Sequence, residues 1–484
     1  TTAGTSNLRL GVNAGDAIVA GGNFNVCVGD EAGTTITLAD HNTLVGFNSG
    51  ALLLTGGENT LLGDATGEAL SVGIQNVAVG YLALTNDTKG STSTAVGVAA
   101  LATQNFTTAT NTFNTAVGYD AGGSVTTGIK NTLIGALAGD AITDADNNVA
   151  VGYQALSANV TGEKNIAIGS AALDANTTGD KNVAVGNSAL GSMNVTDGSE
   201  TFNTAVGADA GKAVTSGIKN TLIGALAGDA ITDADNNVAV GYQALSTNVL
   251  GSHSVALGSS ALLAQNPATA VQMFNIAIGF DAGAAVTTGV QNTIIGGLAG
   301  DALTTGGLTC VGYLSGSALT TSVGNVLMGE LSGTALTTGA NNVAFGSQAL
   351  STDTIGSQSV AIGHDALRTQ NFTTATNSLN TAVGFNAGTA VTTGVQNTLI
   401  GGEAGDALTT GSKNIAIGYR ALSNDRKGNK NVSVGNFSLA TQNFSTDSDS
   451  FNTAVGHGSG ESVTTGINNT LIGALAGDAL TDAD

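Results

Sequence analysis

The chain has 484 residues, of which 71 are glycine, 13 phenylalanine, six tyrosine and one proline, and it has no tryptophan. A conventional globular enzyme core needs more large anchors than this, while 42% apolar and 10% charged residues exclude disorder. The formal charge of −22 argues against a nucleic-acid partner, and no apolar run reaches the ~18 residues of a membrane helix.

A five-residue motif recurs along the whole chain: asparagine, any residue, alanine or leucine, valine or isoleucine, and glycine. Segments 148–152 and 165–169 are examples. The motif's glycine, called the repeat glycine below, occurs 27 times. Its spacing is 17 almost everywhere, 21 at five places, 18 at the first interval and 16 once. A fixed period of this length is typical of a solenoid in which each repeat forms one coil.

Within each coil the sequence predicts four elements in order. A short strand covers the motif, the repeat glycine makes a corner, the following Ala-Gly or Ala-Leu step forms a second strand, and a turn such as 125–128 closes the coil. Valine, isoleucine and threonine favour strands over helices. We therefore predict an all-β fold, a parallel β-solenoid (β-roll) of about 27 coils of 17, occasionally 21, residues. Stacked at ~4.8 Å, these coils would form a rod of roughly 125 Å.

Asparagine occupies the first motif position in 23 of the 27 copies. Asparagine side chains at one position of successive coils can hydrogen-bond into a ladder. Serine in three copies and leucine in one would interrupt that ladder locally. The ladder members that we single out are Asn131, Asn148, Asn165, Asn182, Asn220 and Asn237.

The strand is apolar on both faces. Val149 and Val151 point to one side and Ala150 to the other, and most copies repeat this pattern. A thin coil has only one interior, so the second apolar face needs a partner. We predict a homo-oligomer of identical chains packed around a symmetry axis.

Two cysteines occupy the alanine position of their strands. Cys27 and Cys310 are 16 coils apart, roughly 77 Å at ~4.8 Å per coil, so they cannot pair within one chain. We expect small buried thiols in place of alanine. Contact between symmetry mates near the axis is the alternative.

The five 21-residue coils carry inserts that are candidate binding loops for a glycan or another host-surface group. Repetition of weak sites would give avidity. The alternative is structural, with loops that clasp a neighbouring chain and bury an aromatic ring. The residues proposed for binding are Gln104, Asn105, Phe106, Gln370, Asn371, Phe372, Gln442, Asn443 and Phe444.

An acidic turn with Asp140, Asp144 and Asp146 recurs at 229–235 and 478–484. Closely spaced carboxylates can bind Ca²⁺, but the glycine and distal glutamate of an EF-hand are missing. A solvated acidic turn without metal is the other interpretation. No zinc-ligand spacing, nucleophile elbow or phosphate-binding loop is present either, so we expect no enzyme and no cofactor.

Coils with Ala-Gly and Ala-Leu steps alternate in pairs, which gives 72-residue super-repeats that are clearest at 207–278 and 384–455. We expect residues 1–484 to form one continuous repeat domain. The unfinished last coil suggests a segment of a longer fibrous protein.

The motif resembles the head repeat of trimeric autotransporter adhesins of the YadA-like type. Segments 254–258 and 359–363 are among the close matches. That resemblance implies a trimeric left-handed parallel β-roll, although the coils here are longer than in the family. Similar repeats occur in shafts of phage and viral tail fibres.

Together these patterns predict the shaft of a homotrimeric extracellular fibre on a cell or virion surface. Its function would be structural and adhesive, as in a surface adhesin or filament that projects a tip. A phage or viral tail fibre for host attachment is the alternative, followed by a glycan-binding or ice-binding solenoid and a glycan depolymerase. The expected partners are identical chains and a host-surface glycan or protein, without nucleic acid or a membrane span in this segment.

Overall fold

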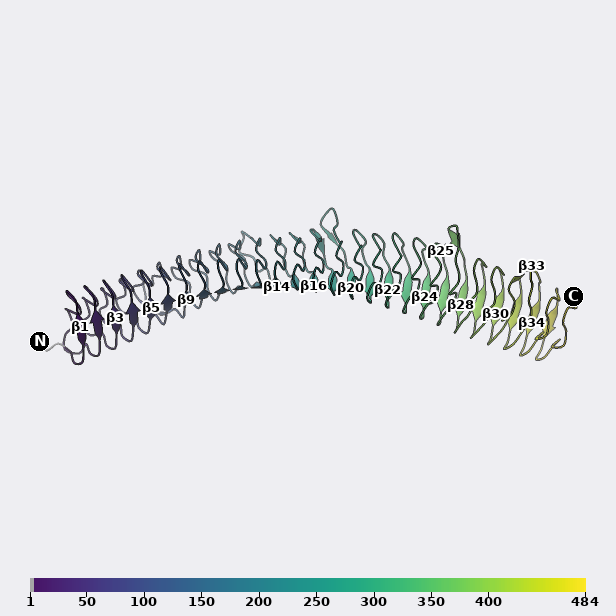
Figure 1. The fold of residues 1–484 in the computed structure, drawn as a ribbon, viewed down its shortest axis with the longest axis horizontal. Helices are drawn as coiled ribbons and strands as arrows, with labels where there is room; N and C mark the ends of the chain where they lie inside the picture. The colour runs from purple at the N-terminus through teal and green to yellow at the C-terminus, as the bar shows by residue number, and fades with distance from the viewer. Residues whose placement is uncertain (1–3) are drawn as a thin grey trace. The chain divides into compact units, whose positions relative to one another are not determined.

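The computed structural model describes residues 4–484, which form strands and turns only (Figure 1). The predicted all-β parallel β-solenoid of about 27 turns, about 17 residues apart, is confirmed. Within residues 4–484 there is no helical segment of the length and apolarity that crossing a membrane requires. The chain divides into two compact units, Thr1–Ala239 and Val240–Asp484.

Each coil contributes one three-residue strand. In the first unit these strands are β1 (Leu8–Leu10), β2 (Val26–Val28), β3 (Thr43–Val45), β4 (Thr60–Leu62), β5 (Val77–Val79), β7 (Thr94–Val96), β9 (Thr115–Val117), β10 (Thr132–Ile134), β11 (Val149–Val151), β12 (Ile166–Ile168), β13 (Val183–Val185), β14 (Thr204–Val206) and β15 (Thr221–Ile223). The unit boundary falls within β16 (Val238–Val240).

The second unit repeats the arrangement. Its coil strands are β18 (Val255–Leu257), β20 (Ile276–Ile278), β21 (Thr293–Ile295), β22 (Thr309–Val311), β23 (Val326–Met328), β24 (Val343–Phe345), β26 (Val360–Ile362), β28 (Thr381–Val383), β29 (Thr398–Ile400), β30 (Ile415–Ile417), β32 (Val432–Val434), β34 (Thr453–Val455) and β35 (Thr470–Ile472).

Neighbouring strands within each unit pair in parallel and without a slip. Ala150 of β11, for example, pairs with Ala167 of β12, and both side chains are fully buried. The repeat glycine fixes the corner after each strand. Gly152 has φ 139°, and a Cβ there would lie 2.5 Å from the carbonyl oxygen of Gly169 on the next coil, so only glycine fits.

The predicted second strand over the Ala-Gly or Ala-Leu step is wrong, because this step forms a turn. Gly139 and Leu156, at the second position of this step in two coils, have φ values of 55° and 57°, which no strand residue adopts. The backbone N–H of Leu156 still donates to the carbonyl of Ala172 on the next coil at 2.9 Å. The turns therefore stack in register like the strands.

Most coils fill their interior in one of two ways. In one Ala-Leu coil, Leu156 packs inside with the small Ala150 and the polar Asn159. In an Ala-Gly coil, two aliphatic side chains fill the interior instead. One belongs to the middle residue of the strand, and the other lies three residues after the glycine of the Ala-Gly step. A Cβ on Gly139 would lie 2.7 Å from Leu133 Cδ2 and 2.8 Å from Ile142 Cδ1. The glycine thus leaves room for the two larger side chains.

The 21-residue coils add a short second ladder to the preceding coil. These two-residue parallel pairs are β6 (Gly90–Ser91) with β8 (Thr110–Asn111), β17 (Gly251–Ser252) with β19 (Val271–Gln272), β25 (Gly356–Ser357) with β27 (Thr376–Asn377), and β31 (Gly428–Asn429) with β33 (Ser448–Asp449). The remaining insert makes a single bridge between Asp180 and Glu200. The extra residues are therefore integrated into the solenoid.

Candidate functional site

The buried asparagine column links successive coils through both ends of each side chain. Asn148 is typical. Its backbone N–H donates to Oδ1 of Asn131 at 2.9 Å, and its Nδ2 donates to the carbonyl of Gly162 at 2.9 Å. The Oδ1 of Asn148 accepts the N–H of Asn165 at 2.9 Å. Asn182, Asn220 and Asn237 repeat the backbone contact at 2.9–3.0 Å. The column thus satisfies polar groups that the thin coil would otherwise bury without a partner.

Glutamine from the insert bridges the column where serine interrupts it. Ser93 is too short to reach the next asparagine. Gln104 donates from Nε2 to Ser93 Oγ at 2.9 Å, and its Oε1 accepts from Nδ2 of Asn114 at 2.8 Å. Gln370 repeats both contacts with Ser359 and Asn380, at 2.8 and 2.9 Å. The sequence contained a signal for this role, because every serine copy is followed by a 21-residue coil.

The same glutamine binds a buried aspartate that our sequence analysis missed. Gln104 Nε2 lies 2.6 Å from Oδ2 of Asp87, whose Oδ1 accepts the N–H of Gly90 at 2.9 Å. Burial raises the pKa of Asp87, and these hydrogen bonds oppose the rise. Equivalent pairs join Gln370 to Asp353 at 2.6 Å and Gln442 to Asp425 at 2.7 Å.

Only some of the residues proposed for binding lie at the surface of the insert loops. Gln104, Gln370 and Gln442 are fully buried, and Phe106, Phe372 and Phe444 are 5–7% exposed, all within their own chain. Only Asn105, Asn371 and Asn443 lie at the surface. The Oδ1 of Asn105 accepts a hydrogen bond from Thr88 at 2.9 Å. Phe106 is buried by its own chain, so a neighbouring chain is not needed to cover its ring. Phe113, at the end of the same insert, is 55% exposed and could still be covered by another chain.

The acidic turn directs its carboxylates to different partners. Asp146 Oδ1 accepts the N–H of Ile129 on the preceding coil at 2.7 Å, and Asp144 Oδ1 accepts from Thr143 at 3.1 Å. Burial raises the pKa of Asp140. Over residues 4–484 no group of three or more histidine, cysteine or acidic side chains is arranged to hold a metal ion.

Both cysteines are free and buried in the strand interior. Burial raises the pKa of the Cys27 thiol to about 11 and that of Cys310 to about 12. The thiolate is therefore strongly disfavoured at neutral pH.

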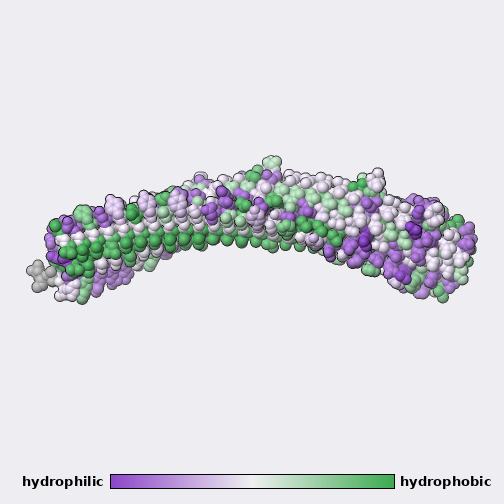
Figure 2. Space-filling view, viewed as in Figure 1, coloured by the Kyte–Doolittle hydropathy of each residue, from purple (hydrophilic) through white to green (hydrophobic). Residues whose placement is uncertain are grey.

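The outward face of the strands has an apolar residue at the third strand position of every coil, and at the first position it has either an aliphatic residue or a threonine. We define this outward face as the first and third strand residues, such as Val149 and Val151, whose side chains point away from the buried middle residue. The third residue is valine, isoleucine, leucine, methionine or phenylalanine in every coil. Along the first unit, Figure 2 shows a hydrophobic stripe on the side where Figure 1 draws the strand arrows. Ile168 is 39% exposed and Phe345 is 52% exposed.

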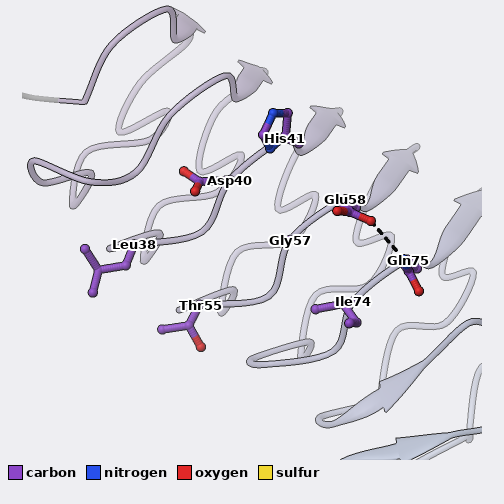
Figure 3. Close-up of a pocket in the computed structure, with 8 residues that line it drawn as sticks. All are labelled: Leu38, Asp40, His41, Thr55, Gly57, Glu58, Ile74 and Gln75. Atoms are coloured by element: carbon purple, nitrogen blue, oxygen red, sulfur yellow. Dashed lines mark hydrogen bonds between the residues drawn. The ribbon is translucent and has the colours of Figure 1, made fainter.

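The groove in Figure 3 lies between successive turns of the first unit. Leu38, Asp40, His41, Thr55, Gly57, Glu58, Ile74 and Gln75 line it. Gln75 donates to Glu58 at 2.9 Å, and His41 stacks on Phe24 with ring centroids 4.9 Å apart. The first contact joins two residues of the groove lining, and the second holds His41 against a residue outside the groove.

Neither protein-family models nor curated proteins gave a match to this chain.

Proposed function

We propose that this chain is a shaft segment of an extracellular homotrimeric fibre with a structural and adhesive function. The observation that carries the proposal is the outward face, whose third strand residue is apolar in every coil and is half-buried or exposed in a single chain. Contiguous apolar surface of this kind marks a protein contact in soluble proteins. Identical chains are the simplest partner, because their faces have the same coil spacing.

The buried hydrogen-bonded columns support a mechanical role. Asn148, for example, links three successive coils, so separating them exposes several polar groups at once. The resemblance of the repeat to trimeric adhesin heads is the reason for proposing three chains. An acidic surface with few lysines suits a fibre that stays soluble outside the cell.

Sedimentation equilibrium tests the assembly. The proposal expects a particle of three times the 47.0 kDa chain mass that persists on dilution. A monodisperse monomer would refute it, because the outward face would then need no partner of its own kind.

Immunogold electron microscopy on the native source tests the location and separates the two fibre types. Label on fibres that leave the cell envelope would support an adhesin or filament. Label on virion fibres would support a tail fibre for host attachment. Label confined to the cell interior would contradict both.

A further inference from the structure

Within each unit, exposed aromatic rings occupy alternate coils at the same position of the repeat. The residue directly after the repeat glycine is aromatic in three runs of alternate coils, and a small residue, a valine or an aspartate lies between consecutive rings. In the first unit the rings are Phe47, Tyr81, Tyr119 and Tyr153, with Asp64, Val98 and Ala136 between them. In the second unit they are Tyr242, Phe280 and Tyr313, with Ser259 and Gly297 between them, and Phe385 and Tyr419 on either side of Gly402. We call these positions the aromatic column.

The backbone holds the column in register. The carbonyl of Tyr119 accepts the N–H of Leu137 at 2.9 Å, and the carbonyl of Ala136 accepts the N–H of Gln154 at 3.1 Å. Rings on alternate coils therefore recur at about 9.6 Å, twice the strand spacing. Backbone hydrogen bonds set this spacing for the residues that carry the rings.

The intervening small residue keeps the rings open. Where neighbouring coils both carry rings, as at His364 and Phe385, the rings stack on one another with centroids 5.6 Å apart. Opposite glycine, by contrast, the ring meets no side chain at that position: a Cβ on Gly297 would lie 3.7 Å from Cδ2 of Tyr313. Tyr81, Tyr119 and Tyr153 are 52–60% exposed. In the first unit the column is thus a row of separated and solvent-exposed rings, whereas in the second unit Phe385 contacts His364 and Tyr419 meets Phe437 edge-on with ring centroids 5.4 Å apart.

We infer that the aromatic column binds an extended, uncharged β-1,4-linked polysaccharide of the cellulose or chitin type. The flat faces of such sugars present C–H groups that pack on aromatic rings, and alternate sugars of the chain face the same way. Their repeat, one disaccharide, is close to two coil spacings. Side chains beside the rings, such as Asn48, Gln154 and Asn386, offer amide groups to the sugar hydroxyls.

Charge restricts the ligand further. The chain carries 35 acidic against 13 basic residues, and Asp120 and Asp281 directly follow two of the rings. An anionic polysaccharide would be repelled by this surface at low ionic strength. Several weak ring contacts on one polymer would combine through avidity.

This inference rests on the proposed adhesive function but does not require the trimer. The test is retention of the full chain on insoluble cellulose and on chitin, with amylose and polygalacturonate as comparison polymers. We expect retention on at least one of the two β-1,4-linked polymers and little on the helical or the anionic one. No retention on cellulose or chitin, or equal retention on all four, would overturn the inference.

Two variants make the test specific. Replacing Tyr81, Tyr119 and Tyr153 by serine removes three rings, and we expect binding to weaken on the order of tenfold or more. The double variant V98Y/Y119V keeps the composition but breaks the alternate spacing, and we expect it to weaken binding as well. Equal binding by wild type and V98Y/Y119V would overturn the spacing argument.

The matched control is F113S/F202S, which removes two exposed rings outside the column and should leave binding unchanged. Sedimentation of each variant separates the outcomes. If the serine variant loses its assembly together with binding, the rings are contacts between chains and the inference fails. If the wild type is a monomer that still binds cellulose or chitin, the inference stands and the trimer fails.

Discussion

Gln104 donates a 2.6 Å hydrogen bond from Nε2 to Oδ2 of Asp87, which lies 17 residues earlier on the preceding coil. Both side chains are fully buried. Because this pair is buried, the 21-residue coils differ from the other coils in their interior contacts as well as in their surface loops. The glutamine connects the interior of three coils through one amide group.

Replacing Gln104 with methionine should destabilise this region by about 2–3 kcal/mol, because Asp87 and Asn114 each lose a buried partner. Hydrogen–deuterium exchange of segment 85–115 and the thermal midpoint would measure the effect. The chain contains its own compensated version, in which Asn176, Asn182 and Met193 stand at the three corresponding positions. The triple variant D87N/S93N/Q104M should therefore recover most of the lost stability.

The matched surface control is Asn105→Ala, which we expect to change stability by less than about 0.5 kcal/mol. If Gln104→Met exchanges no faster than the wild type, the buried network contributes nothing to local stability.

Asn148→Ala should cost about 2–3 kcal/mol, because Asn165 loses the acceptor for its backbone N–H and Gly162 loses a donor. Faster exchange at amides of the two flanking coils would be the direct signature. Asn187→Ala replaces an exposed asparagine at another coil position and serves as the control. Equal effects of the two substitutions would contradict a special role for the column.

The register was predictable from sequence, but the side-chain networks were only partly so. The 17-residue period and the repeat glycine specify one backbone path per coil, since a Cβ at Gly152 would clash with the next coil. Period alone does not show whether Gln104 points inward or outward. Asp87 was missed because aspartate is usually exposed, and its burial depends on a partner supplied by the next coil. The false second strand arose because alanine and leucine give no sign of the positive φ at Leu156.

Interior packing can be tested by giving an Ala-Gly coil the interior side chains of an Ala-Leu coil. Gly139→Leu alone should be destabilising by about 3 kcal/mol or more, because Leu133 and Ile142 occupy the space that the new side chain needs. The triple variant L133A/G139L/I142N copies the set Ala150, Leu156 and Asn159 of the next coil. We expect it to melt within a few degrees of the wild type.

Circular dichroism melts of the single and triple variants would measure this coupling. A triple variant as unstable as Gly139→Leu would show that the three positions do not compensate one another.

Stability should rise as the pH falls from 7 toward 4. Burial, reinforced by the charge of Glu403, raises the pKa of Asp406 to about 6, above the ~3.9 of an unfolded chain. The folded state therefore binds a proton across this window that the unfolded state does not. The stabilisation of the folded state by this proton is complete below about pH 4 and is lost as the pH rises through about 6. Burial raises the pKa of Asp229 and Asp301 in the same direction.

Asp406→Asn should flatten this pH dependence and raise the melting temperature at pH 7.5, by about 1 °C for one site in a chain of this size. Asp144→Asn, at an exposed position, is the control and should leave the slope as in the wild type. A melting temperature that falls steadily from pH 7 to pH 5 would show that the sign is wrong.

The outward face can be tested by comparing two equally exposed aliphatic residues. Ile168 lies on that face and is 39% exposed, and Val160 lies in a turn and is 37% exposed. Ile168→Asp would bury a charge at the proposed contact between chains, so we expect it to weaken assembly by several kcal/mol. Val160→Asp should sediment like the wild type.

Circular dichroism must show retained strand signal in both variants, because each change is at the surface of a folded coil. An Ile168→Asp variant that assembles as tightly as Val160→Asp would exclude this part of the outward face from the contact. Dissociation of both variants would indicate a broader interface that includes the turns, because Ile168 lies on the outward face and Val160 does not.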